Sequence, residues 1–78
     1  MRKDELSKLY DHIRTKLLRA TSEIDVGYQS TRFLEGTRLL YDSNIISYKE
    51  LTRLNNYIIG VADESIQIIN YKRLNNDR

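Results

Sequence analysis

The chain contains no cysteine, no proline and no tryptophan, and only three of its 78 residues are glycine. Without cysteine it can form no disulfide, no thiolate zinc site and no cysteine nucleophile. The glycines, Gly27, Gly36 and Gly60, stand far apart, so the chain has no glycine-rich phosphate-binding loop. Without proline the strongest helix breaker is missing, which favours uninterrupted helices. These absences exclude thiol chemistry and P-loop nucleotide binding.

Long hydrophobic runs are also lacking. The longest uncharged apolar stretch, residues 57–62, is far shorter than the roughly 20 residues needed to cross a bilayer. Residues 2–5 are all charged, so we expect no secretory signal at this end. Apolar residues make up 40% of the chain and charged residues 31%, as in a soluble globular domain. We therefore expect one domain over residues 1–78, located in the cytoplasm and not associated with a membrane.

Positive charge is in only slight excess, with 13 basic against 11 acidic residues and a net charge of +2. Its distribution is uneven, because residues 1–20 carry +3, residues 21–64 carry −3 and residues 65–78 carry +2. A nucleic-acid-binding protein usually gathers its positive charge on one surface. Basic ends around an acidic middle therefore weigh against nucleic acid as the main partner.

Apolar residues recur at spacings of three and four along the chain and predict an all-α fold. We expect a small three-helix bundle with a long C-terminal helix. The expected helices cover residues 4–24, 28–42 and 48–73. Gly27 either ends the first helix or lies in a helix that bends and continues. The turn-forming sequence at residues 42–44 separates the second helix from the third.

The start of the third helix has the strongest local signal. Ser47 and Glu50 have the spacing of a capping box, in which each side chain bonds the main-chain N–H of the other residue. Ile46 before the cap and Leu51 at the fourth helical position match a hydrophobic staple. The helix should therefore begin at Tyr48.

The third helix carries more apolar surface than a helix of a small bundle normally needs. Measured from Leu51, its apolar positions cover an arc of about 200°, whereas a surface helix needs about 100°. Some of these positions also alternate by three and four, as in a coiled coil. They fit the core of a three-helix bundle or the seam of a homodimer, and we expect the helix to mediate dimerisation. The predicted interface residues are Leu51, Leu54, Ile58, Ile59, Val61, Ile66, Ile68 and Ile69.

Catalytic and metal-binding patterns are weak. His12 is the single histidine, and the acidic pairs lie one or two positions apart, where helical side chains do not face each other. Acid–base catalysis also needs a carboxylate with a raised pKa in an enclosed site, which so small a core provides poorly. We expect no enzymatic activity, no catalytic residue, no metal site and no cofactor.

One side of the first helix is basic. Its candidate phosphate-binding residues are Lys8, His12, Lys16 and Arg19. Phosphate recognition is largely electrostatic, so such a strip could hold a nucleic-acid backbone. Glu5 and Glu23 bracket the strip, however, and a solvated face of mixed charge explains it better.

Residues 60–69, followed by Lys72 and Arg73, resemble the turn and recognition helix of repressor-type helix-turn-helix proteins. In this alignment Gly60 takes the place of the turn glycine. The motif's apolar positions are filled by Ile59, Val61, Ile66 and Ile69. The upstream half departs from the pattern at Asn55 and Asn56. The resemblance implies DNA binding by segment 48–73, whereas one continuous helix explains the same apolar positions without a turn.

The sequence thus predicts a non-enzymatic small regulatory or adaptor protein that acts by protein–protein interaction. Six tyrosines support this interpretation, because tyrosine is enriched at interfaces. The expected partners are a second copy of the chain and a protein whose identity the sequence does not give. The alternative is a small DNA-binding transcriptional regulator, which would use segment 48–73 or the basic face of the first helix.

Overall fold

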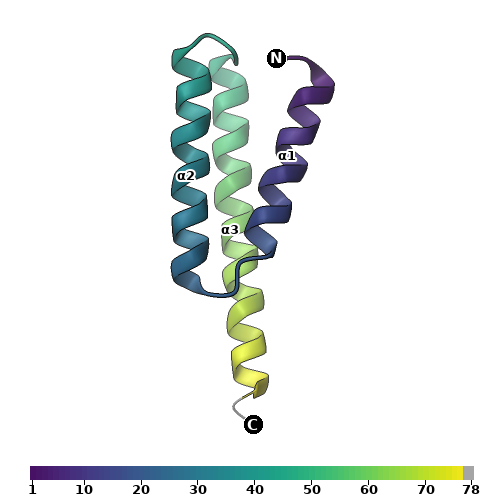
Figure 1. Ribbon diagram of the computed structural model, residues 1–78, viewed down its shortest axis with the longest axis vertical. Helices are drawn as coiled ribbons and strands as arrows, with labels where there is room; N and C mark the ends of the chain where they lie inside the picture. The colour runs from purple at the N-terminus through teal and green to yellow at the C-terminus, as the bar shows by residue number, and fades with distance from the viewer. Residues whose placement is uncertain (77–78) are drawn as a thin grey trace.

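The computed structural model describes residues 1–76 as a bundle of three helices (Figure 1). The helices are α1 (Lys3–Leu18), α2 (Glu23–Asp42) and α3 (Tyr48–Asn76). The chain descends through α1, ascends through α2 and descends again through α3, which continues beyond the loop that joins α1 to α2 (Figure 1). The bundle is elongated, with extents of 50 × 20 × 15 Å. The prediction of an all-helical three-helix bundle with a long C-terminal helix is confirmed.

The predicted boundary between the first two helices is wrong. α1 ends at Leu18 rather than near residue 24, and α2 begins at Glu23 rather than near residue 28. The cause is Ser22, whose backbone is extended and whose side-chain oxygen accepts a 3.1 Å hydrogen bond from the Asp25 N–H. This is an N-cap, and acidic residues in the first turn suit the positive end of the helix dipole. Ile24, which falls within the range expected for the first helix, lies instead on α2 and is 87% exposed.

The turn between α2 and α3 forms where the sequence predicts it. Asn44 has a φ of 60°, the left-handed conformation that asparagine tolerates better than most residues. The Ile45 N–H donates to the Leu40 carbonyl at 2.9 Å, and the Asn44 N–H donates to the Tyr41 carbonyl at 3.0 Å. This pair of bonds is a Schellman motif, which satisfies the last carbonyls of α2 and stops the helix.

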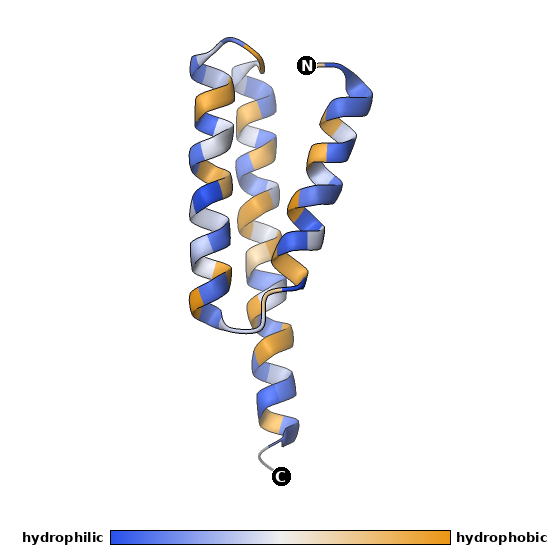
Figure 2. Ribbon diagram, in the orientation of Figure 1, coloured by the Kyte–Doolittle hydropathy of each residue, from blue (hydrophilic) through white to orange (hydrophobic). Residues whose placement is uncertain are grey.

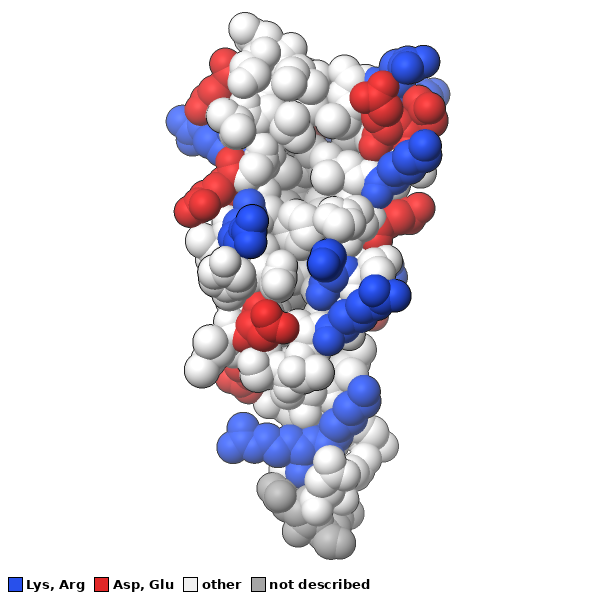
Figure 3. Space-filling view, in the orientation of Figure 1, with Lys and Arg blue, Asp and Glu red and all other residues white. Residues whose placement is uncertain are grey.

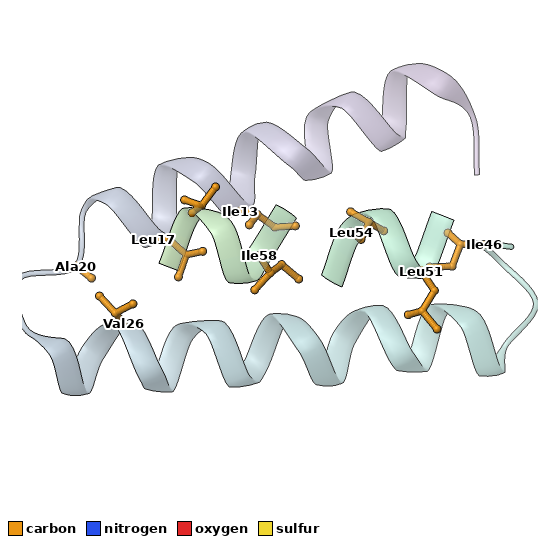
Figure 4. Packing of buried hydrophobic residues seen from close by; sticks show 9 residues of the cluster. Ile13, Leu17, Ala20, Val26, Ile46, Leu51, Leu54 and Ile58 are labelled. Atoms are coloured by element: carbon orange, nitrogen blue, oxygen red, sulfur yellow. The ribbon is translucent and has the colours of Figure 1, made fainter. Parts of the chain in front are cut away.

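The predicted start of α3 is also confirmed. The Glu50 N–H donates to Ser47 Oγ at 3.1 Å, and the Ser47 N–H donates to Glu50 Oε1 at 3.4 Å. Ile46 and Leu51, the two residues of the predicted staple, are both buried (Figure 4). The cap therefore fixes the start of α3 and also joins it to the core.

One thin hydrophobic core runs along the inner side of α3 (Figure 4). Its buried apolar residues come from all three helices and both loops. They are Ile13, Leu17, Ala20, Val26, Ile46, Leu51, Leu54, Ile58 and Val61. Burying an aliphatic side chain of this size stabilises a fold by about 1.5–3 kcal/mol, so this core is the main source of stability.

Half of the residues predicted to form an interface between chains belong to this core. Leu51, Leu54, Ile58 and Val61 are at most 7% exposed, because α1 and α2 together cover the first half of α3. These four residues therefore take the first of the two roles open to them from the sequence, the core of a three-helix bundle. A dimer seam made of these four residues would require the bundle to open.

The turn implied by the resemblance to helix-turn-helix proteins is absent. α3 is one uninterrupted helix from Tyr48 to Asn76, and Gly60 lies within it without a positive φ. Asn55, which departs from that motif, accepts a 2.7 Å hydrogen bond from the Thr37 hydroxyl of α2. The segment is thus a single packed helix, and the interpretation of residues 48–73 as a helix-turn-helix is wrong.

Polar contacts tie α1 to α3. Arg14 donates to both carboxylate oxygens of Glu64 at 3.3 Å, and this contact raises the pKa of the Arg14 guanidinium through hydrogen bonding and charge attraction. Both side chains are nearly half exposed, so solvent weakens the pair. The buried hydroxyl of Ser65 donates to the carbonyl of Leu17 at 2.6 Å. Together these contacts hold the C-terminal half of α1 against α3.

Candidate functional site

The C-terminal end of α3 extends beyond the other two helices. Ser65 is the last buried residue of the helix, and every residue from 70 to 76 is exposed. We call residues 70–76 the projecting segment. Figure 2 shows hydrophobic residues along α3 both beside the other helices and below the loop that joins α1 to α2. The apolar side of α3 thus continues past the point where the other helices cover it.

A groove of about 490 Å³ lies where the projecting segment leaves the bundle. One wall comes from the end of α1 and the following loop, and the other comes from α3. Its apolar lining residues are Leu18, Ala20, Ile68 and Ile69. Ala20 is buried, whereas Ile68 remains 40% exposed. We call this hollow the bundle-end groove.

The charged residues that line the bundle-end groove are all cations. They are Arg19 from the loop after α1 and Lys72 and Arg73 from the projecting segment. Within residues 1–76, no acidic residue contributes to the lining. Figure 3 shows Lys and Arg side chains gathered over the lower part of α3. The groove therefore combines an apolar surface with positive charge.

A second, smaller hollow of about 380 Å³ shares Thr21, Ile69 and Arg73 with the bundle-end groove. The start of α2 supplies its remaining wall, including Glu23 and Ile24. Glu23 brings one acidic group to this side, and Ile24 is almost fully exposed. The two hollows flank the side of α3 that carries Ile69 and Arg73, and together they have more cations than acids.

The remaining predicted interface residues have different surroundings. Ile66 and Ile69 are half-buried and pack against the core. Ile68 and Ile69 meet in the bundle-end groove, whereas Ile59 is 54% exposed and does not line it. Of the eight predicted residues, two therefore belong to the candidate site.

The predicted phosphate-binding strip is divided between two places. His12 and Lys16 line a hollow of about 310 Å³ between α1 and α2, where the His12 ring packs edge-on against Phe33 at 5.7 Å. Arg19 lies instead in the bundle-end groove. Lys8 is exposed, one helical turn before His12.

Sequence reasoning missed residues that come from distant parts of the chain. Arg32 and Gln29 of α2 line the same hollow as His12 and Lys16. Lys72 and Arg73 line the same groove as Arg19, which lies more than fifty positions earlier in the sequence. The sequence did contain a signal for Lys72 and Arg73, because they follow Ile68 and Ile69 by one helical turn on the same side of α3.

Residues 1–76 contain no group of three or more histidine and acidic side chains placed to hold a metal ion. None of the helices in this range is both long enough and apolar enough to span a membrane. Comparisons with known proteins found no matching family model, no matching curated protein and no matching solved structure.

Proposed function

We propose that this chain is a small non-enzymatic regulatory or adaptor protein that binds another protein at the bundle-end groove and the projecting segment. The main support is a change in burial along one side of α3. Leu54 and Ile58 are fully buried on this side, whereas Ile68 is 40% exposed with no helix over it. A partner that packs on the uncovered part would extend the same apolar contact.

The arrangement matches the composition of protein interfaces. Such surfaces have an apolar centre and polar edges, and arginine is enriched in them. In the bundle-end groove Ile68 and Ile69 provide the apolar surface, and Arg19 and Arg73 provide the charged side chains. The groove is open on one side, which suits a segment of another macromolecule better than an enclosed small substrate.

The homodimer expected from the sequence has less surface available to it than the apolar arc of α3 indicated. With Leu51, Leu54, Ile58 and Val61 in the core, the residues of that set with surface left for a second chain are Ile59, Ile66, Ile68 and Ile69. Standard protein interfaces bury about 800 Å² on each partner, which four aliphatic side chains do not supply alone. Self-association therefore has less support than binding to a different protein.

An affinity capture from cells of the native host tests the proposed function. The bait is the full chain, compared with the variants Ile68→Glu and Ile59→Glu. Both substitutions place a charge on an exposed isoleucine of α3, but only Ile68 lines the groove. A partner that is retained by the wild type and by Ile59→Glu and lost with Ile68→Glu supports the proposal. Retention of the same proteins by all three baits contradicts it.

Nucleic-acid binding is the second candidate function, and one observation favours it. The fold places Arg32 of α2 across a hollow from His12 and Lys16, which adds a cation to this part of the basic strip of α1. Titration with duplex DNA at two salt concentrations tests this candidate. Binding to phosphates should weaken by orders of magnitude between about 50 and 200 mM salt. Lack of binding at the lower salt concentration would remove the candidate.

A further inference from the structure

We propose that the bundle-end groove binds an acidic amphipathic helix of a partner protein. In this complex the apolar side of the partner helix packs on Ile68 and Ile69. Its carboxylates face Arg19, Lys72 and Arg73. The inference depends on the proposed function and adds to it the chemistry of the partner.

The shape of the exposed surface favours a helix as the occupant. Ile68 and Ile69 are followed by Lys72 and Arg73, and then by Asn76, on the same side of α3, and all five residues line the groove. This spacing forms a stripe along the helix axis, which is the surface that helices present to one another when they pack. An amphipathic helix docks in such a groove through apolar residues at positions i, i+3, i+4 and i+7.

The position of the groove leads to the same conclusion. Within the bundle, α1 and α2 cover the inner side of α3, and they end at the loop of residues 19–22. The groove begins at Leu18 and Ala20 and continues along α3 below that loop. A docked helix would thus give Ile68 and Ile69 the same kind of packing that Ile58 receives from this chain's own helices.

The charge of the groove selects an acidic partner. Arg19, Lys72 and Arg73 line it, and none of the acidic side chains described by the structure does so. Counting all residues from 65 to 78, the end of the chain still carries a net charge of +2. Glu23 on the neighbouring hollow offsets only one of the three cations. Complementary charges at the edge of an interface raise the association rate and reject partners of like charge.

The same charges argue against a second copy of this chain as the occupant. In a two-fold symmetric pair the same patch of both subunits meets itself. Pairing two bundle-end grooves would bring Arg19, Lys72 and Arg73 of one copy towards the same three residues of the other. Such a contact is repulsive. A nucleic acid would satisfy the cations, but its phosphates would leave the apolar side chains of Ile68 and Ile69 without a partner.

Selection from a display library of random helical peptides against the full chain tests the inference. We expect the enriched peptides to carry apolar residues at helical spacing flanked by Asp and Glu, and to bind more weakly as salt increases. The double variant Lys72→Glu and Arg73→Glu should weaken their affinity by about tenfold or more. The control variant Lys49→Glu and Arg53→Glu has the same charge change at exposed positions of α3 in the first two turns, and it should retain the affinity.

A second control uses the opposite side of the projecting segment. Leu74 is 66% exposed and points about 170° away from the centre of the stripe at 100° per residue. Leu74→Glu should therefore leave peptide binding unchanged, whereas Ile68→Glu should abolish it. Circular dichroism of each variant shows whether its helix content is retained, as expected for substitutions at exposed positions.

The outcomes separate this inference from the proposed function. If the enriched peptides lack acidic residues but bind the wild type and not the Ile68→Glu variant, the acidic chemistry is overturned and the groove remains a protein-binding site. Peptides that bind equally well to the Ile68→Glu variant, or the absence of any enriched peptide, would overturn both. Displacement of acidic peptides by duplex DNA would identify a nucleic acid as the occupant. A chain that sediments as a dimer and becomes a monomer with Ile68→Glu would identify a second copy, and either result would overturn the inference.

Discussion

The hydroxyl of Ser65 donates a 2.6 Å hydrogen bond to the main-chain carbonyl of Leu17, and Ser65 is 2% exposed. Leu17 lies in the last turn of α1, where carbonyls have no partner four residues further along the helix. Ser65 is also the last buried residue of α3. This bond therefore closes the end of α1 at the place where α3 leaves the bundle and the candidate site begins.

Substitution Ser65→Ala should lower the free energy of unfolding by about 0.5–1.5 kcal/mol, because it removes the shorter of two hydrogen bonds to the Leu17 carbonyl, which also accepts from the Ala20 N–H at 3.3 Å. Urea denaturation followed by circular dichroism measures the change. The control is Thr52→Ala, which removes a hydroxyl bonded to the Tyr48 carbonyl on an exposed face of α3. That variant should remain within about 0.5 kcal/mol of the wild type. Equal effects in the two variants would argue against a role for the Ser65 bond.

Substitution Gly60→Ala should raise the free energy of unfolding by about 0.5–1 kcal/mol, because alanine favours a helix interior more than glycine does. Gly60 is exposed, has a helical conformation and has open space around the position of an added Cβ atom. Thermal denaturation measures the gain. A loss of stability would instead indicate that Gly60 forms a turn, as in the helix-turn-helix alignment.

The neighbouring residues Ile58 and Ile59 should respond very differently to truncation. Ile58 is fully buried, so Ile58→Ala should cost about 2–5 kcal/mol of unfolding free energy through lost burial and a residual cavity. Ile59 is 54% exposed, so Ile59→Ala should change it by less than about 0.5 kcal/mol. Chemical denaturation of both variants at the same concentration provides the comparison. Similar losses would mean that Ile59 is covered in solution by something other than this chain's own helices.

Substitution Ser22→Ala should destabilise the protein by about 1 kcal/mol, because it removes the N-cap of α2. Its matched control is Ser7→Ala, an exposed position inside α1 where alanine should be neutral or slightly stabilising. The midpoint of urea denaturation reports both changes. If the two variants have the same midpoint, the hydrogen bond from the Asp25 N–H to Ser22 contributes little.

Sedimentation equilibrium at micromolar concentration should give a mass of 9.3 kDa, that of a single chain. The physical reasons are the burial of Leu54 and Ile58 inside one chain and the repulsion between two cationic grooves. The sequence alone predicted a dimer instead. A mass twice that of the chain would support the dimer, and its dissociation by Ile68→Glu would place the contact at the bundle-end groove.

The helix boundaries show which structural features can be predicted from local sequence signals. The capping box of Ser47 and Glu50 and the turn at Asn44 depend on residues within one helical turn, and both were predicted correctly. The end of α1 was missed because the apolar spacing continues past Leu18 through Ala20 and Ile24. The N-cap at Ser22 overrides this periodicity, although Ser22 with acidic residues after it is itself a local signal.

The candidate site was less predictable because it depends on the relative lengths of three helices. The apolar arc of α3 is visible in the sequence, but the part that remains uncovered depends on where α1 ends. Leu54 and Ile68 are similar aliphatic residues at helical spacing, yet one is fully buried and the other 40% exposed. The meeting of Arg19 with Lys72 and Arg73 follows only from the tertiary fold.

The projecting segment also determines how the molecule should exchange its amide protons with solvent. Residues 70–76 have helical main-chain hydrogen bonds but no buried side chain, so opening them exposes little apolar surface. Opening the turns around Ile58 disrupts the core. Local opening free energies follow such differences, so deuterium should enter the last two turns of α3 long before the middle of the same helix. A partner seated in the groove would slow that uptake and would leave a footprint on an otherwise unprotected stretch of backbone.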